Sequence, residues 1–422
     1  MKSVRKPITI DEAIERVVAS STLGDTETIL LEKADFRYLA EDIIADHPVP
    51  MFDRSMYDGF AVRASDTAQA HPDAPQTLRV TETIAAGEQA KGRLQPGTAM
   101  RIMTGAAIPP GADAVLMLED VREDKDDQGP YIEVTTPVAP GTHISHRGED
   151  MAEGTVLARS GRRIGPGEKA VLATFGYHRV KVYQQPVVAV LATGSELLPV
   201  DAPLVPGKIR NSNSYMVESQ LRRLGAVPKT LGILADHFEA CYHAVTKALE
   251  EVDFVITTGG AAVGDYDFVQ SLIERLNADL LFNKVAMRPG SVTTVAKKGE
   301  KWIFGLSGNP AACFVGVELF VRPVLKRVLG AQALHLPRIS ATLDVDITTT
   351  NSFTRLMRAR TEFHNGKAVV QPVGLDKSGI ISGLLEANSM LVIPGGKRLN
   401  RGEQVQVMWL EEEGMHNESA RL

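Results

Sequence analysis

The chain has 422 residues, of which 44% are hydrophobic and 23% are charged, and its formal net charge is −6. A chain of this length exceeds one ordinary hydrophobic core, so we expect several domains. The negative charge argues against non-specific nucleic-acid binding, which needs a positive face.

The cysteines and the apolar runs exclude further classes of protein. Cys241 and Cys313 lie far apart, so we expect neither a disulfide framework nor a structural zinc site. The N-terminal residues lack the apolar core of a signal peptide, and no apolar run reaches the roughly 18 residues of a membrane span. We therefore expect a soluble cytoplasmic protein with no membrane or nucleic-acid partner.

The first half of the chain predicts one helix followed by β-structure. Apolar residues recur at helical spacing over Ile8–Ser20, and Thr9 can cap this helix. From about residue 52 to residue 138, short β-rich pieces alternate with glycine- and proline-containing turns, which is typical of antiparallel strands. We expect the hydrophilic stretch Arg122–Pro130 to be a surface loop and Arg147–Arg163 to be a connection.

From about Pro186 the pattern changes to strands that alternate with helices. This alternation predicts a parallel or mixed sheet with helices on both faces, and Pro323 is expected to kink the last helix. The expected strands are 186–194, 229–234, 254–256 and 301–306, and the expected helices are 214–224, 237–251, 269–276 and 311–328. After Gly330 the sequence predicts a small β domain with turns at Asn365-Gly366 and Pro394–Gly396, followed by a frayed end.

The segment Val252–Phe268, VDFVITTGGAAVGDYDF, combines a strand, three glycines and two acids ahead of a helix. Backbone N–H groups at such a position can hold an anion, and glycines let a ligand approach the backbone. Asp265 and Asp267 are candidate ligands for a hard cation such as magnesium (Mg²⁺). The open alternative is that the glycines only reverse the chain and the acids only cap the helix.

Two further strand ends carry similar residues. LATGSEL places Glu196 just beyond a strand, and Asp236 follows the strand 229–234. GLSGNPAA leads from a strand into a helix, with Pro310 in its first turn. If these strands are neighbours, their loops converge at the carboxyl edge of the sheet, where ligands bind in open α/β proteins. Together they indicate a phosphate ester and a metal at that edge.

Three other stretches hold candidate site residues. LFNKVAMRPGS carries Lys284 and Arg288, two cations that fit an anionic ligand. The same pattern is equally typical of two solvated side chains on the surface. FDRSMYDGFAVR places two acids, one of them Asp58, and a serine around an apolar-aromatic pair and a glycine, which indicates either a hydrogen-bonded turn or the polar rim of a cleft. Thr104 ends a strand before a proline-rich loop, and Asp150 lies in the connection RGEDM.

Nine motifs, in this order, resemble the MoeA family of molybdopterin molybdenumtransferases, which is related to one domain of gephyrin. They are FDRSMYDGFAVR, RIMTGAAIPPGADAV, RGEDM, LATGSEL, IRNSNSYM, TTGGAAVGDYDF, MRPG, GLSGNPAACF and VELFVRP. The resemblance covers about residues 7–410. It implies a molybdenum insertase that incorporates molybdate into adenylylated molybdopterin, with Mg²⁺-dependent release of AMP. It also implies a homodimer and a partner adenylyltransferase of the MogA type.

Pattern and resemblance together predict a multi-domain α/β plus β fold. We expect a mixed α/β sheet domain of molybdopterin-binding type, β-rich accessory domains and a C-terminal β-barrel-like domain. The expected boundaries are 1–45 with 140–185 for a discontinuous N-terminal and linker domain, 46–139 for a β-rich inserted domain, 186–329 for the α/β domain, and 330–422 for the C-terminal β domain.

The resemblance assigns roles to individual positions. It implies catalytic roles for Asp58, Thr104, Asp150, Glu196, Asp236 and Asp267. It implies metal binding by Glu196, Asp236, Asp265 and Asp267. It implies substrate binding by Thr258, Gly259, Gly260, Lys284, Arg288, Ser307, Gly308, Asn309 and Pro310.

The chain departs from the family pattern at its anion contacts. Ala262 replaces a serine, Arg288 and Ser291 replace lysines, and Ser307 replaces a proline. Arginine keeps the charge of lysine but not its geometry. Two other functions stay open, a non-catalytic gephyrin-like scaffold and a molybdopterin adenylyltransferase. The retained carboxylates favour an enzyme over the scaffold, and the additional β segments argue against the adenylyltransferase.

Overall fold

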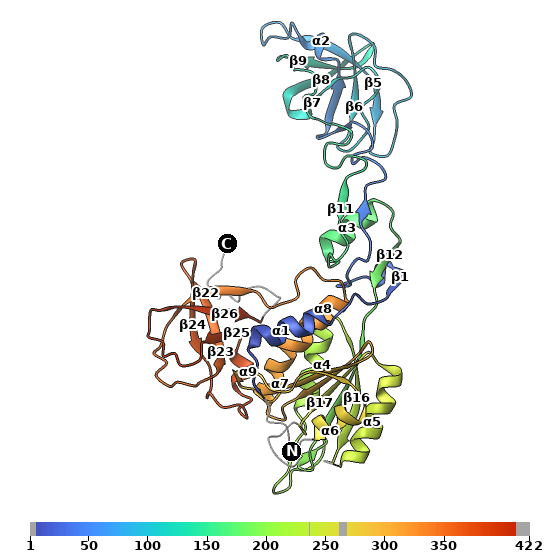
Figure 1. The fold of residues 1–422 in the computed structure, drawn as a ribbon. Coiled ribbons are helices and arrows are strands. Elements are labelled where there is room, and N and C mark those ends of the chain that lie inside the picture. Colours follow the sequence, from blue (N-terminus) through green and yellow to red (C-terminus); the bar gives the residue numbers. More distant parts are fainter. Residues whose placement is uncertain (1–5, 236, 261–267, 411–422) are drawn as a thin grey trace. The chain divides into compact units, whose positions relative to one another are not determined.

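The computed structural model describes residues 6–235, 237–260 and 268–410 (Figure 1). The chain divides into two compact units. The first comprises the chain up to Glu41, Ser160–Pro166 and the chain from Arg179 onward, and the second comprises Asp42–Arg159 and Gly167–His178. Among the described residues, no helix is both long and apolar enough to cross a membrane.

The first unit contains a mixed β-sheet. In spatial order its described strands are β16 (Val227–Leu234), β13 (Val187–Thr193), β17 (Phe254–Thr258), β21 (Lys301–Leu306), β20 (Thr294–Lys298) and β18 (Asp279–Phe282). The strands from β16 to β21 are parallel, whereas β20 and β18 are antiparallel. The predicted mixed sheet is therefore confirmed.

Helices cover both faces of this sheet, as predicted. Successive side chains of β13 point to opposite faces, so Val188 and Val190 join one apolar core while Ala189 and Leu191 join another. The first core includes residues of α1 (Ile10–Ala19) and α4 (Asn213–Leu224), and the second includes residues of α5 (Phe238–Glu251) and α6 (Phe268–Arg275). The Thr9 side chain accepts a hydrogen bond from the Glu12 N–H at 3.1 Å, which confirms the predicted cap of α1.

The segment expected to be one kinked helix consists of three helical pieces. They are α7 (Pro310–Gly316), the π-helical η3 (Val317–Val321) and α8 (Arg322–Val328). The wider π turn lies directly before Pro323, which has no N–H and whose ring clashes with a regular preceding turn. Within η3 the buried Glu318 accepts hydrogen bonds from Gln220 of α4 at 2.8 Å and from Arg322 at 2.7 Å.

The C-terminal part of the first unit is a closed barrel. Around the barrel its five described strands are β23 (Thr354–His364), β24 (Lys367–Pro372), β22 (Arg338–Leu343), β26 (Gln404–Trp409) and β25 (Ser389–Ile393), which pairs again with β23. The predicted Asn365-Gly366 turn joins β23 to β24, with φ values of 50° and 76° that suit a tight hairpin. One short helix, α9 (Gly383–Glu386), interrupts the β-structure that the sequence predicted here.

The strand β19 (Met287–Arg288) connects the barrel to the α/β part of the same unit. It pairs in parallel with β23, so that Met287 lies opposite Thr354 and Arg288 lies opposite Arg355. The remaining elements of the first unit are β1 (Thr26–Leu30) paired with β12 (Arg179–Tyr183), η1 (Leu31–Lys33), and β14 (Leu197–Leu198) paired with β15 (Ile209–Arg210).

The second unit is built on another mixed sheet. Its described strands, in spatial order, are β7 (Ala114–Met117), β4 (Gly59–Val62), β6 (Thr98–Ile102), β5 (Gln76–Ile84), β9 (Gly129–Val134) and β8 (Val121–Asp126). The other short elements between residues 43 and 174 are β2 (Ile43–Ile44) paired with β11 (Val156–Ala158), β3 (Arg54–Ser55) paired with β10 (Ile144–Ser145), α2 (Ala64–Thr67), η2 (Leu118–Asp120) and α3 (Pro166–Thr174).

Four of the five described strand pairings in this sheet are antiparallel, as predicted. The exception is β5 with β6, which are parallel because a long connection between them lets the chain return in the same direction. The stretch Arg122–Pro130 is not a loop, since most of it belongs to β8 and to the start of β9. β8 is an exposed edge strand, and charged side chains are common on such strands because they discourage pairing with other chains.

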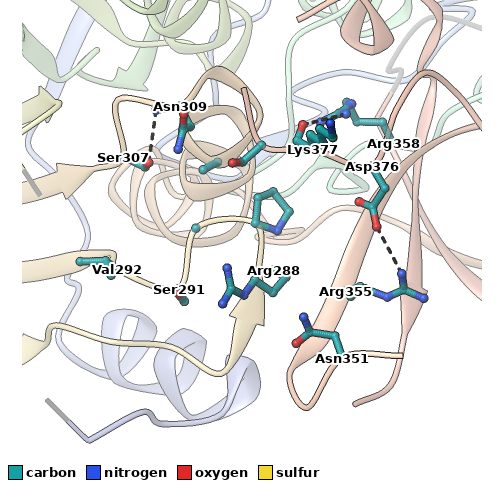
Figure 2. Close-up of a pocket in the computed structure, with 14 residues that line it drawn as sticks. Arg288, Ser291, Val292, Ser307, Asn309, Asn351, Arg355, Arg358, Asp376 and Lys377 are labelled. Carbon is teal, nitrogen blue, oxygen red and sulfur yellow. Dashed lines mark hydrogen bonds and ion pairs between the residues drawn. The ribbon is translucent and has the colours of Figure 1, made fainter. Parts of the chain in front are cut away.

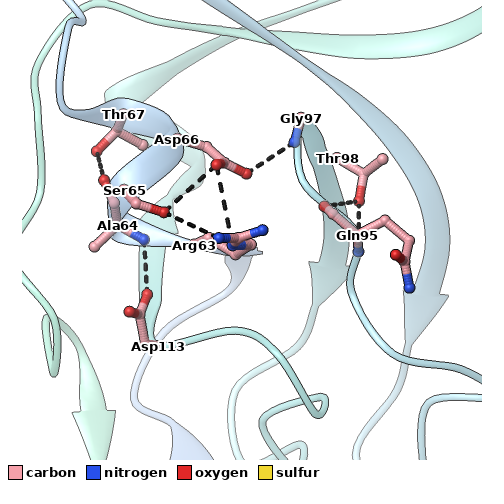
Figure 3. Close-up of polar contacts among 9 residues, drawn as sticks. All are labelled: Arg63, Ala64, Ser65, Asp66, Thr67, Gln95, Gly97, Thr98 and Asp113. Atoms are coloured by element: carbon pink, nitrogen blue, oxygen red, sulfur yellow. Dashed lines mark hydrogen bonds and ion pairs between the residues drawn. The ribbon is translucent and has the colours of Figure 1, made fainter.

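Side chains fix the turns around α2 in this unit (Figure 3). The Asp113 carboxylate accepts a hydrogen bond from the Ala64 N–H at 2.7 Å, at the start of α2. The Asp66 carboxylate accepts one from the Gly97 N–H at 2.8 Å, just before β6. These aspartates satisfy backbone donors that the short helix and the turn leave without a backbone partner.

Candidate active site

The strand ends that precede the predicted acids and glycine loops meet at one edge of the first unit's sheet. In the parallel register Thr193 lies beside Leu234, Ala192 beside Thr258, and Thr258 beside Leu306. The segments that follow β16, β13, β17 and β21 therefore start side by side. The strands are neighbours, which was the condition for convergence of the loops.

Three of the four predicted metal ligands, Asp236, Asp265 and Asp267, lie outside the described residues, as does Ala262. The fourth, Glu196, is exposed just beyond β13, and its carboxylate folds back over Gly194, within 2.8 Å of the position that a Cβ would take there. Within the described ranges, no group of three or more His, Cys, Asp or Glu side chains has the arrangement of a metal site.

The TTGG and SGNP loops touch each other at this edge. Gly259 has a φ of 102°, and a Cβ at this position would lie 2.2 Å from the Thr193 carbonyl oxygen, so only glycine fits. A Cβ on Gly308 would lie 3.5 Å from the Gly259 Cα. The Gly259 N–H donates to the Leu306 carbonyl at 3.0 Å, so this donor is already engaged within the protein.

Asn213, in the motif IRNSNSYM, received no role from the sequence. Its side chain is buried at the start of α4, and its Nδ2 donates to the Gly308 carbonyl at 2.8 Å. Its Oδ1 is a buried acceptor without a hydrogen-bond partner in the described part of the chain. Asn213 thus holds the SGNP loop against the start of α4. The asparagines of its motif are the sequence signal from which such a role could have been predicted.

A cavity of about 600 Å³ lies between the MRPG loop, the SGNP loop and the barrel (Figure 2). Of the predicted substrate-binding residues, Arg288, Ser307 and Asn309 line it. Lys284 does not line it, although its side chain is only partly buried. The other described lining residues are Pro289, Gly290, Ser291, Val292, Ala312, Asn351, Arg355, Arg358, Asp376, Lys377 and Ser378.

The charged side chains of this cavity are mostly basic. Arg288 and Arg355 occupy opposed positions on β19 and β23, where two like charges repel each other. Arg355 is buried, and it donates to the Thr349 hydroxyl and carbonyl, each at 2.8 Å, and to Asp376 at 3.2 Å. Within the described residues, the exposed Arg288 guanidinium has no ion-pair partner. The cavity therefore carries positive charge that the described protein leaves partly unbalanced.

Arg358 is bound mainly to backbone oxygen atoms. Its Nη2 donates to the Leu375 carbonyl at 2.7 Å and to the Lys377 carbonyl at 3.4 Å. Burial lowers the pKa of Arg358 below its ordinary value, while Asp376 acts in the opposite direction. The segment 375–377 is thereby anchored beside the cavity. The carbonyl of the neighbouring Ser378 accepts a hydrogen bond from the Ala311 N–H at 3.1 Å. The Ala311 N–H, just after the SGNP loop, is therefore already paired within the protein.

The barrel's contribution to the cavity was missed by the sequence reasoning. Arg355, Arg358, Asp376 and Lys377 were not predicted, because they come close to Arg288 only through the pairing of β19 with β23. A signal was present in TRLMRAR, where arginines interrupt an otherwise apolar strand and two of them, Arg355 and Arg358, are nevertheless buried. Buried arginines need partners, so such a strand indicates a site or an ion-pair network.

In the second unit Asp58 and Thr104 form a close pair. The Asp58 carboxylate accepts hydrogen bonds from the Thr104 N–H at 2.6 Å and from its hydroxyl at 2.8 Å. Both hydrogen bonds lower the pKa of Asp58, and the bond from the N–H has the larger effect. This exposed carboxylate therefore stays ionised at neutral pH. The predicted Asp150 belongs to the same unit and is exposed, and its N–H donates to the Val49 carbonyl at 3.1 Å.

The cysteine next to the SGNP segment is not a nucleophile. Cys313 lies in α7 and is fully buried, and burial raises the pKa of its thiol to about 12. Thiolate is the reactive form of cysteine, so this side chain is protonated and packs as a small apolar group. The chemistry of the edge therefore rests on oxygen and nitrogen groups.

An open α/β sheet with glycine loops at its carboxyl edge, next to a cation-lined cavity, is typical of proteins that bind a phosphorylated or otherwise anionic ligand. Comparison with known families makes the class specific. Residues 8–176 match the model described as "MoeA N-terminal region (domain I and II)", residues 189–327 match "Probable molybdopterin binding domain", and residues 340–410 match "MoeA C-terminal region (domain IV)".

Similar proteins cover the whole chain. The molybdopterin molybdenumtransferase of Bacillus subtilis (strain 168) is 48% identical over 98% of this chain and 96% of its own length. That of Staphylococcus aureus (strain MRSA252) is 43% identical over 98% of each chain. The crystal structure of the molybdopterin biosynthesis MoeA protein from Pyrococcus horikoshii has a TM-score of 0.82 and 32% identity, covering 97% of this chain and 100% of its own. The chain belongs to the MoeA family, as its motifs predicted.

Proposed function

We propose that the protein is a molybdenum insertase, a transferase that incorporates molybdate into adenylylated molybdopterin and releases AMP. The full-length similarity to molybdopterin molybdenumtransferases supports this function and does not favour the scaffold or the adenylyltransferase. The structural observation that carries it is the basic cavity beside the glycine loops. Both anionic reactants, molybdate and a pyrophosphate-containing nucleotide, need such an environment.

The cavity suits a small oxyanion together with part of a larger ligand. Its volume of about 600 Å³ falls within the range of small-molecule sites. Arg288 and Lys377 offer side chains without an ion-pair partner in the described residues, and Arg355 adds a fixed guanidinium. Guanidinium groups bind tetrahedral oxyanions through parallel hydrogen bonds. We assign the molybdate contacts to this cavity, with Ser291 and Ser307 as hydroxyl donors from the two loops.

The pyrophosphate of the adenylylated substrate is assigned to the carboxyl edge of the sheet. Thr258, Gly259 and Gly308 lie there, and Asn213 holds the SGNP loop in place. The donor set of Glu196, Asp236, Asp265 and Asp267 has the oxygen-rich chemistry that Mg²⁺ prefers, and the strands that precede these residues in the chain, β13, β16 and β17, end at one edge. A bound Mg²⁺ would neutralise charge on the pyrophosphate.

The second unit is assigned to the same reaction through Asp58, Thr104 and Asp150. The ionised Asp58 is suited to accept a hydrogen bond from the substrate or from water. A homodimer and a MogA-type adenylyltransferase that supplies the substrate complete the proposal. Light scattering of the purified protein tests the dimer, and a monomer at assay concentration would contradict it.

Product analysis tests the proposed reaction. Purified protein, adenylylated molybdopterin, molybdate and Mg²⁺ should yield AMP together with cofactor that activates an apo-molybdoenzyme. The variant Asp267→Asn should lose Mg²⁺-dependent AMP release while keeping the wild-type circular dichroism spectrum. Substrate binding without AMP release by the wild-type protein would overturn the insertase, and full turnover by the variant would overturn the metal role of Asp267.

A further inference from the structure

The cavity contains one carboxylate among its described lining residues. Asp376 lies with Arg288, Arg355, Arg358 and Lys377 around the same space (Figure 2). A carboxylate in a site for an anion opposes binding, because it repels the ligand and occupies a cation that the ligand needs. Its presence therefore needs an explanation beyond anion binding itself.

The ion pair between Asp376 and Arg355 is asymmetric. The Arg355 side chain is 7% exposed, whereas the Asp376 side chain is 45% exposed. Arg355 also makes two hydrogen bonds of 2.8 Å to Thr349, while its contact with Asp376 is longer, at 3.2 Å. Arg355 is thus fixed independently of the carboxylate, and Asp376 is the partner that can turn toward solvent.

Several hydrogen bonds fix the backbone around Asp376, whereas the contact described for its side chain is the one with Arg355. Arg358 donates to the carbonyls of Leu375 and Lys377, and the Ser378 carbonyl accepts from the Ala311 N–H. Release of Arg355 therefore requires only a rotation of the Asp376 side chain, with no movement of the segment 375–378. Such a rotation costs little, because it exchanges one partly solvated ion pair for hydration.

We propose that Asp376 is an internal counter-ion that an incoming oxyanion displaces from Arg355, and that this exchange sets the anion affinity of the cavity. The inference rests on the proposed function, since it takes the cavity as the molybdate site. In the resting protein Asp376 balances Arg355, whose position on β23 lies opposite that of Arg288 on β19. When the oxyanion enters, it takes the place of the carboxylate at Arg355 and also gains the positive charge of Arg288. Asp376 thus weakens the binding of any small dianion and favours its later release.

The barrel offers a matched control for the loss of this charge. Asp344 pairs with Arg401 at 2.9 Å, and neither residue lines the cavity. Its side chain is 43% exposed, close to the 45% of Asp376. The variant Asp344→Asn therefore removes the same charge from the same barrel without changing the cavity. The variant Asp376→Glu keeps the charge within the cavity.

Calorimetric titration with molybdate, tungstate and sulfate at low ionic strength tests the proposal. Asp376→Asn should bind each dianion at least about fivefold more tightly than the wild-type protein, because it removes the competing charge next to Arg355. Asp376→Glu and Asp344→Asn should stay within about twofold of wild type. The gain should shrink as salt is added, and thermal unfolding should verify that each variant is folded.

The outcomes separate this inference from the proposed function. If Arg288→Met weakens oxyanion binding while Asp376→Asn leaves it unchanged or weaker, the counter-ion role is wrong and the anion cavity stands. A gain of equal size in Asp344→Asn would also overturn the counter-ion role, because it would reflect net charge alone. If neither the wild-type protein nor Asp376→Asn binds any oxyanion, the anion cavity fails and the inference fails with it.

Discussion

The cavity of the first unit and the Asp58–Thr104 pair of the second unit hold their charges in opposite ways. In the cavity, cationic side chains from β19, from β23 and from the segment after β24 come together, and Arg355 is buried. Asp58 is exposed, and one residue, Thr104, donates both of the hydrogen bonds described for its carboxylate. The cavity depends on the assembled barrel, whereas the pair depends on one loop contact.

This difference separates stability from ligand binding. A buried arginine loses its hydration, and its partners must compensate for that loss, so removing it disturbs the fold. An exposed carboxylate keeps most of its hydration, so changes at Asp58 should alter its ionisation more than the folding equilibrium. Substitutions at the two places should therefore give different combinations of effects.

The largest expected effect is at Arg355. The variant Arg355→Met leaves Asp376 and the Thr349 carbonyl without their described partner. We expect the free energy of unfolding to fall by about 1.5–3 kcal/mol, since the hydrogen bonds of a buried, charged guanidinium are lost. Oxyanion affinity should fall more than about tenfold, because one charge-assisted contact is lost. Urea denaturation and calorimetric titration measure the two effects.

Arg360 provides the matched control on the same strand. It pairs with Glu362 at 2.8 Å, and both side chains are 43% exposed. Arg360→Met should change the free energy of unfolding by less than about 0.5 kcal/mol and leave anion affinity unaltered. Equal destabilisation by the two substitutions would show that the burial of Arg355 has no special role.

The strands and helices were predictable where apolar residues dominate the pattern. The continuous apolar run of β17 and the amphipathic pattern of α4 both indicated the correct element, because one face or both faces must be buried. β8 was missed, because its side chains are charged and its stability comes from pairing with β9, which local sequence does not encode. The same reason hid the parallel register of β5 and β6.

The site was predictable from loops but not from pairing between distant strands. Glycines and acids at strand ends indicated the edge, and Arg288 and Ser307 were expected to bind substrate before their cavity was known. Arg355 and Asp376 were not expected, since their place in the cavity follows from the register of β19 against β23. No local pattern specifies which distant strand completes a site.

The next largest effect is expected at Arg288, which lines the cavity and contributes little to the stability of the fold. Arg288→Met should lower oxyanion affinity about tenfold, because it removes an arginine without an ion-pair partner in the described residues. The free energy of unfolding should change by less than about 0.5 kcal/mol. In the AMP-release assay the KM for molybdate should rise more than kcat falls, as for a ground-state contact. A loss of stability like that of Arg355→Met would contradict this division of roles.

A smaller effect is expected at Asp113, which is a structural acid of the second unit. Asp113→Ala removes the acceptor for the Ala64 N–H at the start of α2 (Figure 3). We expect the free energy of unfolding to fall by about 1 kcal/mol, as for the loss of a helix cap. The rate of AMP release below the unfolding temperature should be unchanged. A reduced rate in the folded variant would place Asp113 in the reaction and remove the contrast with Asp58.

The smallest effect is expected at Thr104. Thr104→Val removes the hydroxyl donor and keeps the N–H, which is the larger cause of the lowered pKa of Asp58. The pKa of Asp58 should therefore rise part of the way toward its ordinary value of 3.8. Because the folded-state pKa lies below the unfolded value, Asp58 contributes stability at pH values above the unfolded pKa and loses it as pH falls through the folded pKa. The variant should lose some of this contribution and begin acid unfolding at a slightly higher pH. Carbon-detected NMR titration of the Asp58 carboxyl measures the shift, and an unchanged pKa would mean that the N–H alone holds the charge.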